Sequence, residues 1–273
     1  MRRRKESVGF GYPSCGFPQH HPSLLENKMT KTLVFAVIAF LMVASAQAAV
    51  EYNLAYDGAQ ETVNGAIFMQ WDEPKPMGSG VIDAFVGIQG HSGGAQHGYN
   101  TDGALEFDTL SGGHTHALLL SDIPVVTLGG ISYREFLLDI NQSVNHSILS
   151  LDEVIFYQAA TATLTGYSPD SARNSTNPAF GVPIYDLDAG GDNYVKLDDQ
   201  WGAGSGKGDM LLFVPNSVFG AGAYVYLYSM CGDTIDGSDG FEEWAVGLGG
   251  PIIPEPATIA LLLLGGLLLR RKH

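Results

Sequence analysis

Positive charge is scarce in the middle of this 273-residue chain. Between Ala49 and Glu255 only five lysines and arginines face 27 aspartates and glutamates, which gives this segment a formal charge of −22. The other nine of the 14 basic residues lie at or before Lys31, or after Leu269. Nucleic acid is therefore excluded as a partner, because contacts to phosphates require positive charge. Cations and neutral glycans remain compatible with such an acidic surface.

Cysteine is also scarce, since Cys15 and Cys231 are the two that the chain contains. Cys15 lies in an N-terminal segment that we expect to be removed, so an intrachain disulfide in the mature protein is excluded. For Cys231 a buried small hydrophobic residue is the favoured interpretation. A reactive thiol and a dimer bridge are the alternatives.

Long amphipathic helices are missing from the sequence of residues 49–250. Apolar or alternating segments of strand length occur instead, and turn residues separate nearly all of them. The 35 glycines and the low share of charged residues, 16%, are typical of β-proteins with many turns. The sequence predicts a mainly β fold, as a single antiparallel β-sandwich or jelly-roll-like ectodomain over 49–250. The predicted strands are Gly65–Trp71, Ile82–Gln89, Thr115–Leu120, Val125–Leu128, Glu135–Ile140, Glu153–Gln158, Tyr194–Leu197, Met210–Val214 and Tyr224–Tyr228.

Sequence signatures of catalysis are missing as well. The chain has neither the H-E-x-x-H pattern of zinc proteases nor the G-x-S-x-G turn of serine hydrolases. A glycine-rich run at 202–208 lacks two defining residues of a phosphate loop, because Trp201 and Gly208 stand where a glycine and a hydroxyl are needed. These absences favour a protein that is not an enzyme.

Histidines are the remaining candidates for a transition-metal site. His114 and His116 share one face of a predicted strand, and His91 and His97 lie in a nearby glycine-rich loop. No third ligand has diagnostic spacing. Polar histidines on a solvent-facing surface are therefore favoured over a zinc or copper site.

Residues 29–48 have the organisation of a secretory signal peptide. Lys31 supplies positive charge, an apolar run from Leu33 to Val43 follows, and Ala46 and Ala48 are the small residues that signal peptidase recognises. We expect cleavage after Ala48. A transmembrane anchor is the alternative, but the run is shorter than the roughly 20 residues needed to span a bilayer.

Residues 1–28 form an extension before this signal. They combine a basic cluster, Arg2 to Lys5, with prolines and glycines, and they show no apolar periodicity. We therefore expect translation to start at Met29. An unusually long positive region of the signal is the alternative, and in both cases these residues are absent from the mature protein.

The last segment, residues 251–273, combines prolines, a short apolar run and a basic cluster. As a helix the 13 apolar residues from Ala257 would measure about 20 Å, against a hydrocarbon core of about 30 Å. Such a short run with two glycines suits a removable sorting segment better than a permanent anchor. The positive-inside rule places the basic cluster in the cytoplasm and the ectodomain outside. The predicted sorting motif comprises Pro254, Glu255, Pro256, Arg270 and Arg271.

This tail resembles the PEP-CTERM sorting signal of Gram-negative bacteria. The resemblance implies two processing partners, signal peptidase and an exosortase, the latter a membrane-embedded, cysteine transpeptidase-like enzyme whose role is to remove such tails. Parts of the ectodomain also resemble an uncharacterised group of PEP-CTERM proteins that has no assigned activity. The segments that carry this second resemblance are 98–102, 133–141, 149–153, 208–210 and 239–244.

Two acidic, glycine-rich loops, 186–193 and 233–243, are the candidate cation sites. Ca²⁺ accepts roughly six to eight oxygen ligands in irregular geometry, which such loops can supply. Neither loop has the spacing of an EF-hand, and ordinary Asx-turns explain the same composition. The sequence requires no cofactor, and calcium is the one that it could bind. The candidate calcium ligands are Asp186, Asp188, Asp192, Asp236 and Asp239.

A row of tyrosines is the candidate glycan-binding surface. Tyr224, Tyr226 and Tyr228 alternate with apolar residues, so they share one face of a predicted strand. Rings in a row can stack on sugars, and Trp201 is a further candidate. A half-buried outer face of a sheet is the favoured interpretation of the same pattern.

Taken together, these features predict an exported cell-surface or extracellular-matrix protein with a structural or adhesive role. We expect it to cross the inner membrane, to be tethered by its C-terminal helix, and then to reach the cell surface or the medium. A carbohydrate-binding module for exopolysaccharide is one alternative. A secreted polysaccharide-acting enzyme is the other, and the release of reducing ends would distinguish it from a module that only binds.

Overall fold

The computed structural model describes residues 48–71, 82–90, 93–169, 176–202, 208–238 and 240–249. These residues are mainly β, as predicted, with three short 3₁₀ helices. The strands are β1 (Val50–Asn53), β2 (Gln60–Val63), β3 (Ala66–Gln70), β4 (Ala84–Gln89), β5 (Gln96–Tyr99), β6 (Leu118–Leu119), β7 (Val125–Leu128), β8 (Ile131–Asp139), β9 (Ile148–Ala159), β10 (Tyr185–Asp186), β11 (Asn193–Asp198), β12 (Met210–Pro215), β13 (Tyr224–Cys231) and β14 (Phe241–Val246). The 3₁₀ helices are η1 (Leu120–Asp122), η2 (Asp199–Gly202) and η3 (Asn216–Val218).

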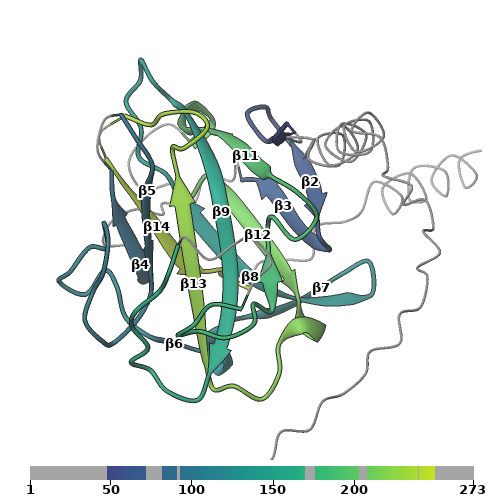
Figure 1. Cartoon of the computed structure of the whole chain (residues 1–273). Coiled ribbons are helices and arrows are strands. Elements are labelled where there is room, and N and C mark those ends of the chain that lie inside the picture. Colours follow the sequence, from purple (N-terminus) through teal and green to yellow (C-terminus); the bar gives the residue numbers. More distant parts are fainter. Residues whose placement is uncertain are drawn as a thin grey trace, which may run out of the picture. The chain divides into compact units, whose positions relative to one another are not determined.

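The strands form two sheets that face each other (Figure 1). Sheet A has the order β1-β11-β9-β13-β5, with β10 beside β9 and β6 beside β13. Sheet B has the order β2-β3-β12-β8-β14-β4, with β7 beside β8. Within the described residues β1 and β11 are the one parallel pair, and every other pairing of named strands is antiparallel. Two sheets rich in antiparallel pairs agree with the predicted β-sandwich.

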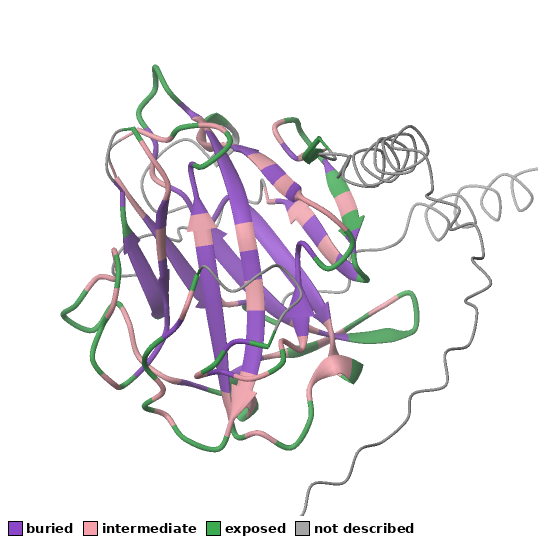
Figure 2. Cartoon of the chain, in the orientation of Figure 1, coloured by how far each residue is buried: buried purple, intermediate pink, exposed green. Residues whose placement is uncertain are grey.

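The main hydrophobic core lies between the two sheets. Alternate residues of each strand point inward, and one continuous cluster joins Phe156 and Leu227 of sheet A to Phe68, Phe136 and Trp244 of sheet B. The central strands of both sheets are buried along most of their length (Figure 2). Removal of this apolar surface from water is the main term that stabilises the fold.

Several strands, β8 and β9 among them, are longer than predicted, and in β9 the reason is buried polar residues. β8 begins four residues before the predicted Glu135, and β9 spans Ile148–Ala159 although only Glu153–Gln158 was predicted. Ser150 and Asp152 are buried within β9 and interrupt its apolar pattern. Conversely, the predicted strand at Thr115–Leu120 is reduced to two residues, because the chain turns into η1.

Five strands were not predicted, namely β1, β2, β5, β10 and β14. Most are short or polar, and β14 carries two adjacent glutamates, Glu242 and Glu243, that are both buried. The hairpin that joins β2 to β3 uses Asn64 and Gly65, whose φ angles of 50° and 86° are those of a type I′ turn. The Asn64-Gly65 dipeptide directly after β2 is the local sequence signal for this hairpin.

Candidate functional site

Aromatic side chains gather on the outer face of sheet A. The segment between β9 and β10 folds over this face and contributes Tyr167, which stacks on Tyr228 with ring centroids 4.2 Å apart. Phe180 of the same segment meets Tyr99 and Tyr226 edge to face, at 5.1 and 5.3 Å. Such edge and offset contacts add to the stabilisation from burial. The aromatic cluster comprises Tyr99, Tyr157, Tyr167, Phe180, Tyr226 and Tyr228.

The predicted tyrosine row therefore does not form an open platform. Tyr226 and Tyr228 are only 1% and 3% exposed, and Tyr224 is half-buried. The Tyr226 hydroxyl donates to the main-chain oxygen of Thr161 at 2.6 Å and accepts from the Leu164 N–H at 3.1 Å. The alternation was predicted correctly, and the face is an outer sheet face covered by a loop. The side chain of Trp201 lies outside the described residues.

Glu106 fastens this covering segment to β5. Its Oε2 accepts hydrogen bonds from the Tyr99 hydroxyl, from the Gly166 N–H at 2.9 Å and from the Tyr167 N–H at 3.3 Å. The bond from Tyr99 is the main reason that the pKa of Glu106 is lowered, because it favours the charged form. The pKa of Tyr99 is raised, first by burial and then by this carboxylate. The pair is thus a phenol that donates to an ionised acid.

Phe107, the next residue, has an unusual backbone. Its φ of 59° lies in the left-handed region, which a bulky side chain rarely adopts. The ring is 42% exposed, and its centroid lies 4.4 Å from that of His97 with a tilt of 34°. Tyr99 and Tyr167 meet the same ring edge to face at 6.2 and 6.5 Å. An exposed ring is therefore held against the border of the aromatic cluster at a cost in backbone strain.

Contacts to both sheets hold this strained loop in place. The Asp108 N–H donates to the His97 main-chain oxygen at 3.1 Å, and the Asp108 Oδ2 accepts from the His97 N–H at 3.0 Å. The Asp108 main-chain oxygen accepts from the Gln89 N–H of β4 at 2.8 Å. Gly98 allows the close approach, since a Cβ there would lie 2.6 Å from the Thr109 hydroxyl oxygen.

His97 is the polar group nearest to the exposed ring. Its Nδ1 lies 2.9 Å from the Tyr228 hydroxyl. Burial lowers the pKa of His97 and outweighs the opposing effect of Asp108. The imidazole beneath Phe107 is therefore neutral at physiological pH.

The first predicted calcium loop is occupied by its own hydrogen bonds. The Asp186 Oδ1 accepts from the Asp188 N–H at 2.8 Å, two residues on, which is an Asx-turn. The Asp188 Oδ1 accepts from the Asn193 N–H at 2.8 Å. Asp192 is half-buried, and its main-chain oxygen accepts from the Val50 N–H of β1. These contacts correspond to the Asx-turn interpretation of the loop.

The second predicted loop is organised by Asp152 of β9. Its Oδ2 accepts from the Asp233 N–H at 2.9 Å and its Oδ1 from the Thr234 N–H at 3.0 Å. Asp236 lies in the same loop and is exposed, and Asp239 lies outside the described residues. In the described part of the chain no three His, Cys, Asp or Glu side chains are arranged to hold a metal ion.

The histidines have separate partners. The His114 Nδ1 lies 3.1 Å from the Glu243 Oε1, and the His116 Nδ1 lies 2.9 Å from the main-chain oxygen of Ala117. His97 contacts Phe107 and Tyr228 at the border of the aromatic cluster instead, and His91 is outside the described residues. Among the described residues, these histidines do not take part in any group of three potential metal ligands.

A row of buried carboxyl groups, which the sequence did not suggest, crosses the outer face of sheet B. Glu243 of β14 pairs with Asp139 of β8, and Asp209 immediately precedes β12, whose first residue pairs with Leu138. The three side chains therefore lie next to one another on one face. We call Asp209, Asp139 and Glu243 the carboxyl row.

Burial makes two of these acids, Asp139 and Asp209, harder to ionise. It raises the pKa of Asp139 to about 8, with further contributions from Glu243 and Asp199, and it raises the pKa of Asp209 well above its usual range. The Asp209 Oδ2 accepts from the Ile140 N–H at 2.8 Å, whereas its Oδ1 and the Glu243 Oε2 accept no hydrogen bond from the described chain. Neutral carboxylic acids suit such surroundings better than carboxylates.

Glu242 is a further buried acid, on the opposite face of β14. Its Oε1 accepts from the Gln142 Nε2 at 2.6 Å, and burial raises its pKa to about 8. Cys231 is fully buried nearby, and burial and Glu242 both raise its pKa. The thiol is therefore a buried hydrophobic group here, as favoured from the sequence.

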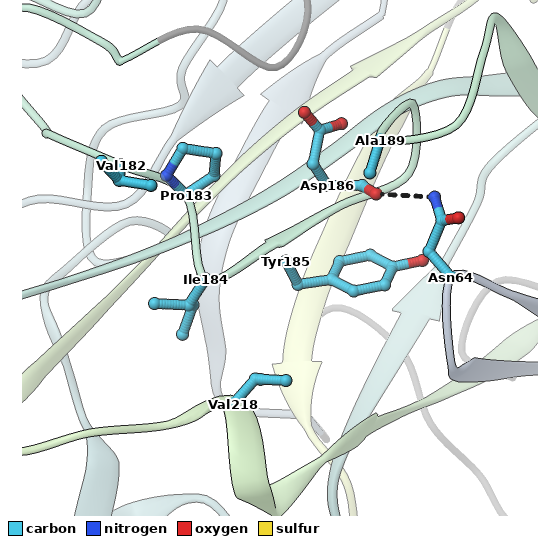
Figure 3. Close-up of a pocket in the computed structure, with 8 residues that line it drawn as sticks. All are labelled: Asn64, Val182, Pro183, Ile184, Tyr185, Asp186, Ala189 and Val218. Atoms are coloured by element: carbon cyan, nitrogen blue, oxygen red, sulfur yellow. Dashed lines mark hydrogen bonds between the residues drawn. The ribbon is translucent and has the colours of Figure 1, made fainter.

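A pocket of about 300 Å³ opens beside the β2–β3 turn (Figure 3). The Asn64 Nδ2 donates to the Asp186 main-chain oxygen at 3.0 Å, and the Tyr185 hydroxyl donates to the Val63 main-chain oxygen at 3.2 Å. These polar groups bond to the protein itself, and the rest of the wall is largely apolar. The lining residues are Asn64, Val182, Pro183, Ile184, Tyr185, Asp186, Ala189 and Val218.

Comparison with known proteins adds no name to this geometry. No family model, no curated protein and no solved structure matches the chain. The resemblance of the tail to the PEP-CTERM signal stays a prediction, because residues 251–273 lie outside the described residues. Of the two residues at the predicted signal cleavage site, Ala46 also lies outside them, and Ala48 is the first described residue.

The residues of greatest interest were not found from the sequence. Glu106 and Phe107 sit in a loop without a motif, and a positive φ leaves no trace in a single sequence. Asp139, Asp209 and Glu243 are far apart in the chain and become neighbours only through strand pairing.

Proposed function

We propose that this chain is an exported surface or extracellular-matrix protein whose folded domain has a structural or adhesive role. The observation that carries the proposal is the agreement of the two chain ends. A signal peptide at 29–48 and a sorting tail at 251–273 both place the acidic domain outside the inner membrane. Within the described residues no helix is long and apolar enough to span a membrane.

The arrangement of strands supports a jelly roll within this proposal. The proposed jelly roll comprises four strands of each sheet, in the orders β11-β9-β13-β5 and β4-β14-β8-β12. At most connections between these strands, the chain crosses from one sheet to the other. Examples are β4 to β5, β8 to β9 and β12 to β13, which all cross from sheet B to sheet A. Jelly rolls of eight strands occur in lectin domains and capsids, so this architecture suits a protein that binds ligands or forms assemblies. The fold alone indicates no particular chemistry.

The buried acids argue against the enzymatic alternative. Most enzymes that hydrolyse glycosidic bonds use two carboxyl groups, one on either side of the bond. The acids whose pKa is raised to about 8, Asp139 and Glu242, are buried at 9% and 0% exposure. A polysaccharide cannot reach them in this structure.

Mass spectrometry of the protein from cell envelopes and from the medium tests the proposal. We expect the mature form to lack both Lys31 and Arg270. An intact C-terminal peptide that ends at His273, in protein delivered to the surface, would contradict the sorting signal and leave a plain membrane anchor.

A further inference from the structure

We propose that Phe107 and the border of the aromatic cluster form a binding site for a neutral polysaccharide. This inference rests on the proposed surface location, because such polymers are met outside the cell. The proposed site uses the ring of Phe107, which lies on the same side of sheet A as the predicted tyrosine row. The site residues are Phe107, His97, Glu106 and Asp108.

The ring has the two properties that stacking on a sugar requires, which are an open face and a fixed position. Phe107 is 42% exposed although His97 covers one side at 4.4 Å. Its neighbours Glu106 and Asp108 are tied to β5 and to the covering segment by hydrogen bonds. Stacking therefore costs little conformational entropy, because the ring is ordered before the ligand arrives.

The backbone strain favours a functional role over a neutral surface position. A glycine or asparagine at position 107 would adopt a φ of 59° more easily than phenylalanine. The strained residue is also the one whose aromatic ring is exposed. Strained residues that the surrounding structure holds in place gather at binding sites.

The groups beside the ring indicate the class of ligand. Both flanking side chains, Glu106 and Asp108, are acids, and ionised carboxylates only accept hydrogen bonds. The hydrogen bonds that Glu106 accepts from the described residues all use Oε2, which leaves Oε1 available. Sugar hydroxyl groups can donate to such oxygens. Uronic acids, sulfates and phosphates would be repelled by them and by the formal charge of −22 over residues 49–255.

Affinity gel electrophoresis of the full chain in detergent tests the site. Native gels would contain laminarin, dextran or galactomannan as neutral polymers, and alginate as an anionic one. We expect at least one neutral polymer to retard the protein, and alginate not to. Phe107→Ala should weaken that retardation at least about tenfold, as expected when a central aromatic contact is lost, and Phe107→Trp should preserve it.

Matched controls separate the site from general effects. Tyr56→Ala removes an aromatic side chain of similar exposure, 49%, from the β1–β2 loop and should leave binding unchanged. Phe107→Gly fits the left-handed backbone, so it keeps the fold even where Phe107→Ala does not, and it should also lose binding. Retardation by none of the neutral polymers, equal retardation by alginate, or full binding by Phe107→Gly would each overturn the proposal. These outcomes are independent of whether the tail is cleaved, so they leave the proposed export untouched.

Discussion

The outer faces of the two sheets bury different chemistry. Sheet A places phenol and phenyl rings outside its main core and covers them with the segment between β9 and β10. Sheet B carries an apolar cluster around Leu137 and Phe213 and, at one end of β8, the carboxyl row. Rings lose nothing by being neutral, whereas carboxyl groups must give up their charge to be buried. The stability of the aromatic face should therefore be independent of ordinary pH, whereas the outer face of sheet B should be most stable where Asp139 and Asp209 hold their protons.

Tyr226→Ala should produce the largest effect, because it breaks the covered face of sheet A. The ring is 1% exposed, and its hydroxyl bonds to Thr161 and Leu164 of the covering segment. Removal of a buried aromatic side chain lowers the free energy of unfolding by about 3–5 kcal/mol. Urea denaturation measures this loss. Tyr224→Ala, on the same face but half-buried, is the control, and an equal loss in both variants would show that the cover contributes nothing specific.

The carboxyl row should make stability depend on pH. Asp139 has a pKa of about 8 in the folded state, against roughly 4 when unfolded. The folded state keeps its proton to higher pH, so this group's contribution to stability is complete below about pH 4 and is lost as the pH rises to about 8. Glu242, with a pKa of about 8, acts in the same direction.

Thermal melting tests this dependence. We expect a higher Tm near pH 5.5 than near pH 8.5, since Asp139 and Glu242 ionise between the two. Asp139→Asn, which stays neutral, should raise the Tm at about pH 8.5 by several degrees, raise it less at about pH 5.5, and change it little below about pH 4. The aromatic face offers the contrast, because Tyr157→Phe should shift the Tm equally at both pH values. A Tm for Asp139→Asn that follows the wild-type pH profile would contradict the assignment.

Glu106→Gln should have a smaller effect, confined to the cover of sheet A. It removes the charge that the Tyr99 hydroxyl and the amides of Gly166 and Tyr167 bind, which costs about 1 kcal/mol. Hydrogen exchange at those two amides should speed up. Glu51→Gln is matched, because Glu51 accepts from the Tyr194 hydroxyl at an exposed site, and it should leave those amides protected. Unchanged hydrogen exchange in Glu106→Gln would contradict the role of Glu106 in fastening the covering segment to β5.

The smallest predicted difference lies between two substitutions of Phe107. Both Phe107→Ala and Phe107→Gly lose the contact with His97, but only alanine must still adopt the left-handed φ of 59°. Phe107→Gly should therefore be more stable than Phe107→Ala by about 1 kcal/mol. Urea denaturation of the pair measures this difference. If residue 107 had an α-helical or extended backbone, Phe107→Ala would be at least as stable as Phe107→Gly. That result would contradict the backbone strain at Phe107.

The sequence by itself determined the class of fold and most of the central strands. Alternation along Tyr224–Tyr228 and the apolar run Met210–Val214 correspond to β13 and β12, because side chains alternate between the two faces of a strand. The acidic balance of the ectodomain is likewise a property of composition. The alternation does not predict which face of β13 is covered, because a half-buried face and an open face show the same two-residue period.

Tertiary structure alone decided the carboxyl row and the exposed ring. Asp209, Asp139 and Glu243 meet because β12, β8 and β14 are neighbours in sheet B, and strand order is set by packing over the whole chain. Phe107 is exposed and strained because Glu106 and Asp108, on either side of it, are held by β5 and the covering segment. A single sequence records which residues a loop contains. The backbone angle and the neighbours of each residue depend on contacts between segments that are distant along the chain, and these exist only in the folded molecule.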